Sequence, residues 1–114
     1  RAFEFVLREV CAVRDPFSPD GGHVFAIPDE GRNEVSALHE ELYRGPLKPA
    51  RRIDIPYVPH VTVAAHADFT RCESLANDLG RQWTALSGRV EVLTIVRIAG
   101  GQVTTVMEQP LRVR

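Results

Sequence analysis

Hydrophobic residues recur along this chain with two periods, one of two residues and one of three to four residues. The first is typical of strands with one buried face and the second of amphipathic helices. The first pattern predicts strands over residues 3–13, 23–28, 60–66, 89–99 and 103–111, and the second predicts helices over 29–44 and 69–87. The order β-β-α-β-α-β-β indicates an α+β fold, a mainly antiparallel sheet with two amphipathic helices on one face.

The two predicted helices differ in the width of their apolar stripe. The helix over 29–44 has a narrow stripe, and either Asp29 or Asn33 would cap it. The helix over 69–87 has a wide stripe, which indicates that it packs closely on the sheet. Its apolar positions are Cys72, Leu75, Ala76, Leu79, Trp83 and Leu86.

Turn residues separate most of the predicted elements. Residues 14–22 are rich in Pro, Asp and Gly and predict a loop, and residues 100–102 predict a tight hairpin turn. The strand over 89–99 has apolar residues on both faces, so both faces need cover. An uncovered apolar face favours association, and we therefore expect a homodimer or a covering segment.

Composition limits the classes of function. The chain has 114 residues, 44% of them hydrophobic, and a net charge of −1, which indicates one globular domain and gives no charge argument for nucleic-acid or membrane binding. It has no apolar run of membrane-spanning length and no signal-peptide pattern, so we expect a cytoplasmic protein. Cys11 and Cys72 lack metal-site spacing, and no metal or cofactor is expected.

The most informative stretch is DIPYVPHVTVAAH, residues 54–66. Side chains alternate across a strand, so His60 and Thr62 share one face and Val61 and Val63 share the other. The valine face is expected to pack on a helix, and the His60 face is expected to meet solvent or a cleft. Imidazole transfers protons near neutral pH, and a nearby hydroxyl can bind a phosphate oxygen.

The spacing H-x-T is short and common, and the pattern alone favours an ordinary strand histidine beside a β-forming threonine. His39 and His66 are interpreted as structural residues. Lys48, Arg51 and Arg52 form either a basic rim beside His60 or a solvated loop. Arg97, on the strand over 89–99, is either a further phosphate contact or a surface ion-pair residue.

The longer motif YVPHVTVA, residues 57–64, resembles the second signature motif of the 2H phosphoesterase superfamily, in the branch of 2′-5′ RNA ligase-like proteins and RNA 2′,3′-cyclic phosphodiesterases. The order FEFVLREVCAV, HVFAIP, VSALHEELYR and PYVPHVTVA is similar to the later part of that family. The closing LTIVRIAGGQVTTVMEQPL resembles its last hairpin.

The resemblance implies a two-lobed fold in which each lobe supplies one H-x-T/S motif, and a metal-independent reaction at a 2′,3′-cyclic phosphate. It assigns His60 as a general acid or base and Thr62 to the phosphate oxygens, and it suggests that Tyr57 stacks on a base. The implied partner is an RNA end or a small nucleotide carrying a cyclic phosphate.

The sequence departs from that family pattern at the first motif. It contains one H-x-T, and His23 is not accepted as a substitute because Phe25 stands where the hydroxyl belongs. The chain begins at Arg1 rather than Met, so a single domain over 1–114 that lacks an N-terminal part is expected; two copies each lending His60 are the alternative. Three roles follow: a cyclic phosphodiesterase or ligase-like enzyme, a non-catalytic nucleotide-binding module, or an interaction protein with a relic motif.

Overall fold

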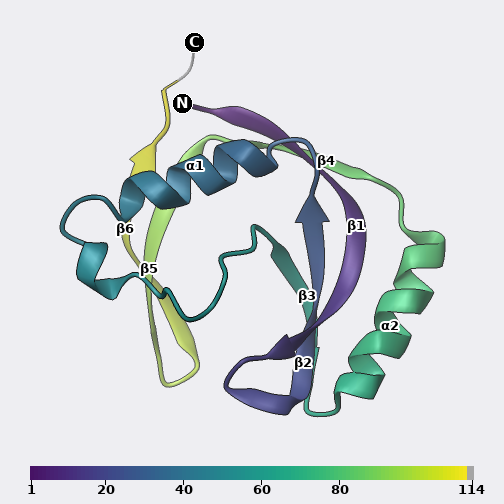
Figure 1. Ribbon diagram of the computed structural model, residues 1–114. Helices are drawn as coiled ribbons and strands as arrows, with labels where there is room; N and C mark the ends of the chain where they lie inside the picture. The colour runs from purple at the N-terminus through teal and green to yellow at the C-terminus, as the bar shows by residue number, and fades with distance from the viewer. Residues whose placement is uncertain (113–114) are drawn as a thin grey trace.

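The computed structural model describes residues 1–112 and has an α+β architecture with two helices, which confirms the predicted fold class (Figure 1). One four-stranded antiparallel sheet has the strand order β3-β2-β1-β4. Its members are β1 (Phe3–Asp15), β2 (Ser18–Pro28), β3 (Val61–His66) and β4 (Leu86–Val90). The remaining elements are α1 (Arg32–Leu42), the short 3-10 helix η1 (Lys48–Ala50), α2 (Phe69–Gln82), and the hairpin of β5 (Val92–Ala99) and β6 (Gln102–Pro110).

Helix α2 covers one face of the four-stranded sheet. Val24 of β2 is fully buried against Cys72 and Ala76 of α2, and the Cys72 thiol is buried with it. The helix begins at Asp68, whose side chain accepts a hydrogen bond from the Thr70 amide at 3.0 Å. The apolar stripe of α2 therefore supplies the main core of the molecule.

Helix α1 does not lie on that face, contrary to the prediction. It has no buried residue, and Figure 1 shows it on the other side of the sheet from α2. Its N-terminal cap is neither Asp29 nor Asn33 but Gly31, whose φ of 87° favours glycine. A Cβ on Gly31 would also lie 2.6 Å from the Glu4 carbonyl oxygen, so only glycine lets α1 start this close to β1.

The predicted helix over 69–87 is wrong beyond Gln82. Trp83 has an extended backbone, and its indole Nε1 donates a hydrogen bond to the Leu7 carbonyl at 2.9 Å. Leu86 then begins β4, which pairs with β1. The apolar spacing continued past the end of the helix because Trp83, in the connection, contacts β1 and Leu86 belongs to β4.

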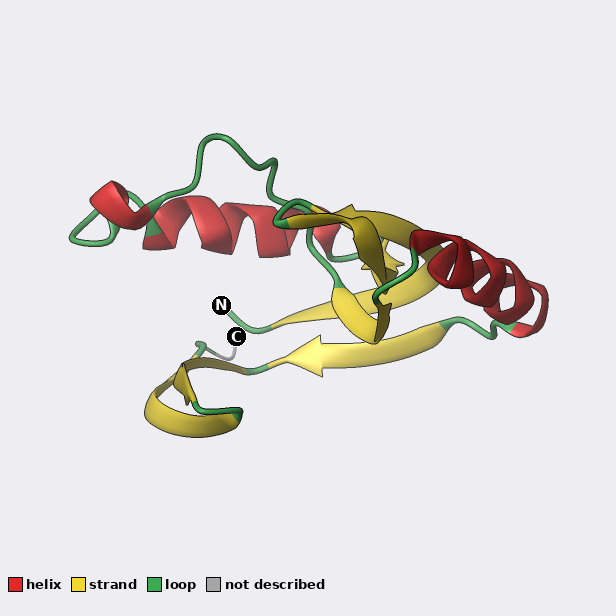
Figure 2. Cartoon of the chain, turned by 90° about the horizontal axis from the view of Figure 1, so that it is seen from below, coloured by secondary structure: helices red, strands yellow, loops and turns green. Residues whose placement is uncertain are grey.

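The predicted strand over 89–99 is divided at Glu91. Residues before it complete the four-stranded sheet, and residues after it form the hairpin with β6, turning at Gly100 and Gly101 with φ of 58° and 76°. The predicted tight turn is thus confirmed. Figure 2 shows this hairpin set apart from the four-stranded sheet.

The predicted loop over 14–22 is mostly strand. β1 continues to Asp15 and β2 begins at Ser18, so only two residues form the turn. The glycine content of this stretch suggested a loop, but Gly22 has another reason to be glycine. A Cβ there would lie 2.5 Å from the Val13 carbonyl oxygen and 2.7 Å from the Phe69 ring. Glycine is required by close packing here and not by a turn.

Strand β3 contains a bulge that changes the predicted faces. Phe25 pairs with Thr62 and Val24 pairs with Ala64, so Val63 is the extra residue. Val61 and Val63 are 48% and 41% exposed, and Ala64 packs on the α2 core instead. The expectation that the two valines hold this strand to a helix is therefore wrong.

Candidate active site

A cavity of about 680 Å³ lies on the sheet face opposite α2, between the sheet, α1 and the segment 43–60. Its walls come from four parts of the chain that are distant in sequence: the β1–β2 hairpin, β2, α1 and the loop before β3. His60 and Tyr57 both line it, so two of the predicted site residues meet in one place.

The His60 ring is oriented by a hydrogen bond to the backbone of the segment that leads into β3. Nδ1 lies 2.6 Å from the Val58 carbonyl oxygen, and because a carbonyl only accepts, Nδ1 carries the proton and donates it. In the neutral ring, Nε2 is then the free base. Pro59 is buried and fixes its own φ, so the segment enters β3 with little freedom.

Phe25 is the second support of His60. The two rings stack with centroids 3.6 Å apart and planes at 13°. Phe25 reaches this position because β2 alternates its side chains, sending Val24 to the α2 core and Phe25 to the cavity. A hydrogen bond at one edge and an aromatic ring on one face together restrict the imidazole to one orientation.

The opposite wall is a stack of aromatic side chains. His39 of α1 lies 3.7 Å from the Tyr57 ring with planes at 12°, and Tyr43 lies 4.8 Å from His39 with planes at 44°. Burial, followed by the neighbouring Tyr43 hydroxyl, raises the pKa of Tyr57 above its usual range. Tyr57 therefore remains a neutral ring at physiological pH, held on one face by His39.

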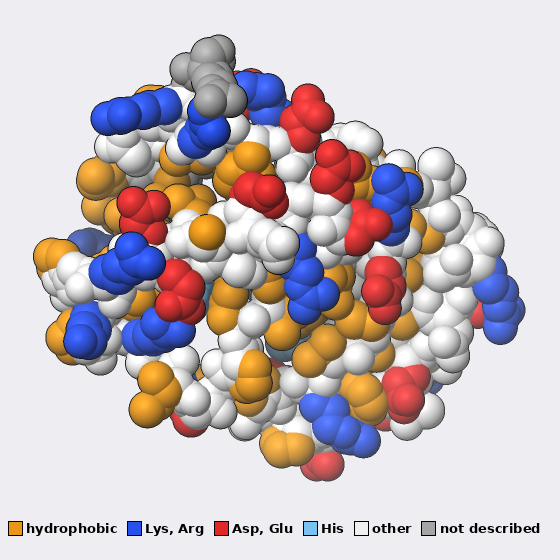
Figure 3. All heavy atoms as spheres, turned by 45° about the horizontal axis from the view of Figure 1, so that its top comes forward, with side chains coloured by type: hydrophobic (Ala, Val, Ile, Leu, Met, Phe, Trp, Pro, Cys, Tyr) orange, Lys and Arg blue, Asp and Glu red, His pale blue; other side chains and the backbone are white. Residues whose placement is uncertain are grey.

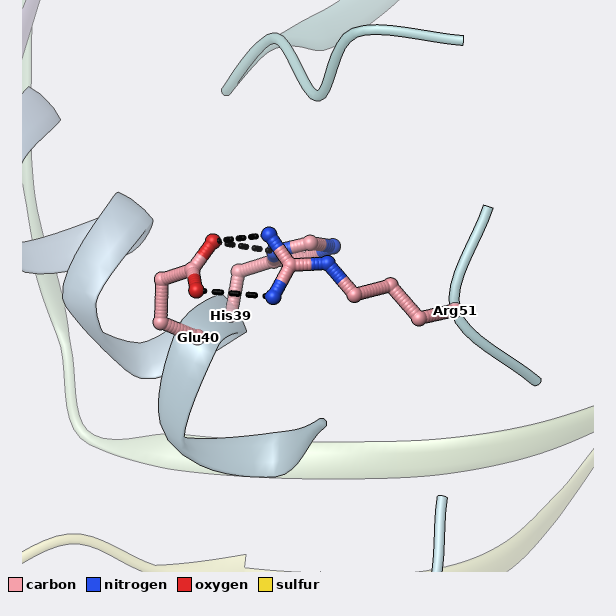
Figure 4. A network of polar contacts seen from close by, with 3 residues as sticks. All are labelled: His39, Glu40 and Arg51. Carbon is pink, nitrogen blue, oxygen red and sulfur yellow. Dashed lines mark hydrogen bonds and ion pairs between the residues drawn. The ribbon is translucent and has the colours of Figure 1, made fainter. Parts of the chain in front are cut away.

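The loop before β3 is joined to α1 by an ion pair (Figure 4). The Arg51 guanidinium donates two hydrogen bonds to the Glu40 carboxylate, at 2.8 and 2.5 Å. This hydrogen bonding lowers the pKa of Glu40. The same carboxylate lies 3.9 Å from Nδ1 of His39, which is buried and makes no hydrogen bond. The pair thus connects the loop to the helix that supports Tyr57.

Of the predicted basic rim, Arg52 alone among Lys48, Arg51 and Arg52 lines the cavity. Its guanidinium donates hydrogen bonds of 2.9 and 2.7 Å to Asp54, which lower the pKa of that carboxyl to about 2. It also lies 5.1 Å from the Phe17 ring centroid. The rim is therefore largely neutralised by its own acidic partners.

Thr62 lies beside the cavity and is not part of its lining. It pairs with Phe25 across β2 and β3, so its side chain is on the same sheet face as the Phe25 ring. Arg97 pairs with Thr104 in the separate hairpin and does not line the cavity either. His66 accepts a hydrogen bond from the Asp68 amide at 2.9 Å, which agrees with a structural role at the strand end.

The cavity lining is aromatic and rich in histidine. Of its two arginines, Arg14 has its guanidinium over Phe69 of α2, and Arg52 is paired with Asp54. Of the fourteen lining residues, three are histidines, two are tyrosines, two are phenylalanines and two are arginines, and among the described residues that line it none is Asp or Glu. On the face shown in Figure 3, by contrast, acidic, basic and hydrophobic side chains are mixed. A planar ring that stacks on aromatic side chains suits such a lining.

Sequence reasoning missed Phe17, His23 and Phe25 as cavity residues and gave His39 a structural role only. The alternation of HVFAIP carried a signal for two of them, because His23 and Phe25 share one face of β2 and Val24 the other. His39 and Phe17 gave no such signal, since their approach to the cavity depends on the loop that crosses to α1.

The described residues contain no cluster of three or more potential metal ligands. Over the same residues, no helix has the length and apolar character needed to cross a membrane. Both cysteines are free.

Comparison with known proteins identifies the family of this chain. The family model described as the 2′-5′ RNA ligase superfamily matches residues 2–102, and this chain belongs to that superfamily, a class of phosphoesterase- and ligase-like proteins. A search of curated proteins found no match, and a search of solved structures found none.

Proposed function

We propose that this chain acts on 2′,3′-cyclic phosphate ends of RNA or small nucleotides, as a metal-independent phosphodiesterase or in the reverse ligase-like direction. The observation that carries the proposal is His60, held by Val58 and Phe25 with Nε2 free, at the edge of an aromatic, histidine-rich cavity. Membership in the 2′-5′ RNA ligase superfamily supports the same chemistry.

In the hydrolytic direction, a water oxygen forms a new bond to phosphorus, and one ring P–O bond breaks. The water loses a proton, and the released 2′ or 3′ oxygen gains one. Nε2 of His60 accepts the first proton or, once protonated, donates the second. The Thr62 hydroxyl donates to a non-bridging phosphate oxygen, where it stabilises the charge of the transition state.

Tyr57 is proposed to bind the base of the terminal nucleotide. One face of its ring is covered by His39, and the side chain is still 46% exposed, so the other face is open to a ligand. Stacking of a base on an aromatic side chain stabilises binding by about 1–3 kcal/mol.

Residues 1–114 contain one H-x-T, whereas the resemblance to 2H phosphoesterases implies two. The second proton transfer is proposed to use His60 of a second copy, a histidine of an accompanying lobe, or solvent. The runner-up function follows from the same observation: a nucleotide-binding module that holds the cyclic phosphate and does not open it.

An assay with a nucleoside 2′,3′-cyclic monophosphate in excess EDTA tests the proposal. We expect conversion to a nucleoside monophosphate that EDTA does not prevent, together with saturable binding. Binding without conversion supports the runner-up function. If the chain neither binds nor converts the substrate, both functions are contradicted and the interaction role is left.

A further inference from the structure

The cavity continues well beyond the surroundings of His60 and Tyr57. It runs along β2 past Phe25 to His23 and ends at the β1–β2 turn, where Phe17 forms part of the wall. Its volume of about 680 Å³ lies in the upper part of the range of about 300–1,000 Å³ for small-molecule sites. One end is occupied in the proposed function, and the other end has no assigned role.

His23 and His60 flank the Phe25 ring. His23 stacks on it with centroids 5.7 Å apart and planes at 24°, and His60 stacks at 3.6 Å and 13°. The register puts them on opposite sides of that ring, because Phe25 pairs with Thr62, His23 pairs with Ala65, and His60 precedes β3. Three nearly parallel rings thus form a row across the floor of the cavity.

This row does not have the geometry of an acid–base pair. In an in-line displacement, the attacking and leaving oxygens lie on opposite sides of phosphorus, so the acid and the base must approach from opposite sides. Parallel rings based on the same sheet face present their edges side by side, with a phenyl ring between them. His23 is consequently a second, separate polar contact in the cavity.

The groups around His23 leave it available to a ligand. The side-chain hydrogen bonds of the described residues do not include its ring. Arg14, the nearest cationic side chain of β1, donates a 2.8 Å hydrogen bond to the Pro19 carbonyl and lies 4.2 Å from the Phe69 ring centroid. Phe17 beyond it is 72% exposed, with the Arg52 guanidinium over its ring.

We propose that this end of the cavity binds a second nucleotide, so that the substrate is an RNA end of at least two nucleotides. This rests on the proposed function. The terminal nucleoside lies at Tyr57 with its cyclic phosphate at His60. His23 donates a hydrogen bond to the phosphodiester on the 5′ side of that nucleoside, and the base of the preceding nucleotide stacks on Phe17.

Turnover and binding of two substrates test the proposal, a nucleoside 2′,3′-cyclic monophosphate and a dinucleotide ending in the same cyclic phosphate. For the unmodified chain we expect a KM or Kd about 10-fold lower for the dinucleotide. In His23→Gln and in Phe17→Ala this preference should fall to 2-fold or less, with the monophosphate constants unchanged.

Two controls match these variants. His66→Gln changes an exposed histidine outside the cavity, and Ile53→Ala removes an apolar side chain that is 91% exposed and does not line it. Both should retain the preference. Equal affinity for the two substrates in the unmodified chain overturns the proposal, as does a preference that survives His23→Gln.

Loss of monophosphate turnover in His23→Gln also overturns it, because His23 would then act at the cyclic phosphate itself. The proposed function fails in a different way, with no turnover and no binding of either substrate. Circular dichroism of each variant, compared with that of the unmodified chain, identifies a folding defect. Phe17→Ala changes an exposed position, so it tests the second-nucleotide site even if His23→Gln does not fold.

Discussion

At the scale of single residues, the site depends on how His60 is held. Its Nδ1 is committed to the Val58 carbonyl and one ring face to Phe25, so a single nitrogen is left for chemistry. Sequence analysis identified the residue type and its cavity-facing position but not these two supports. The Val58 bond depends on the backbone path, and the Phe25 contact depends on a pairing between distant strands.

Replacing Phe25 by Leu should therefore reduce kcat more than it changes KM. The aliphatic side chain still fills the floor of the cavity and no longer defines the plane of the imidazole, and such misorientation costs about 10-fold or more in rate. Steady-state kinetics with the cyclic monophosphate measure both constants. A KM increase at unchanged kcat would show that Phe25 binds the substrate and does not position His60.

Tyr57→Ala should weaken substrate binding by about 5- to 150-fold, because a stacking surface that contributes about 1–3 kcal/mol is removed. Tyr57→Phe keeps the ring and should bind nearly as well as the unmodified chain. Equilibrium binding of a nucleoside 2′-monophosphate measures both variants. Equal losses in the two would assign the effect to the hydroxyl group and not to stacking.

At the scale of elements, the strands were predicted well and their ends poorly. Alternation in HVFAIP and the wide stripe of α2 reflect a two-sided sheet, which is local information. The division at Glu91 and the end of α2 at Gln82 are set by pairing of β4 with β1, which no local pattern contains. The bulge in β3 likewise brings Ala64 to the α2 core, a role predicted for Val61 and Val63, which are exposed.

The bulge leads to a stability prediction. Val24→Ala should lower the free energy of unfolding by about 2 kcal/mol, since it removes methyl groups from a fully buried position against α2. Val61→Ala is the matched control and should cost about 0.5 kcal/mol or less, because that side chain is 48% exposed. Urea denaturation, monitored by the fluorescence of Trp83, measures the free energy of unfolding of both variants. Similar losses in the two would contradict the assignment of Val24 to the core and of Val61 to the surface.

The loop that carries Tyr57 should loosen in acid. The pKa values of Glu40 and Asp54 are lowered in the folded state, that of Asp54 from 3.8 to about 2. Their contribution is therefore complete above the unfolded-state pKa values near 4 and is lost as the pH falls through the folded-state values. Both groups are exposed, so the effect is expected in loop order and not in global stability.

Hydrogen-exchange protection factors for residues 48–57 measure this effect. They should decrease below about pH 4 relative to those of β1 and β2. Glu40→Gln should produce part of the same decrease at pH 7, because it removes the charged partner of Arg51. Protection that is independent of pH and unaffected by the substitution would show that the aromatic stack alone holds the loop.

At the scale of the whole molecule, the β5–β6 hairpin is the least supported part. Ile98 and Val103 face each other across its strands and are 72% and 66% exposed. A two-stranded hairpin is marginally stable without cover, and exposed apolar strands associate. The homodimer expected from the sequence remains a prediction, and this surface is where we expect its interface.

Sedimentation velocity at increasing concentration tests that expectation. The unmodified chain should shift toward a dimer, and the double variant Ile98→Thr, Val103→Thr should remain monomeric, since Thr keeps the strand propensity and reduces the apolar surface. Ile53→Thr, at an exposed loop position, is the control and should behave as the unmodified chain does. A monomer at every concentration for the unmodified chain would contradict this role of the hairpin.

In the proposed function, His60 performs proton transfer at a cyclic phosphate without a metal ion. The most direct measurement is kcat/KM for a 2′,3′-cyclic phosphate substrate in EDTA, in the unmodified chain, in His60→Ala and in the control His66→Ala. We expect His60→Ala to lose at least about 100-fold and His66→Ala to stay within about 2-fold of the unmodified chain. Equal activity of His60→Ala and the unmodified chain would contradict the claim.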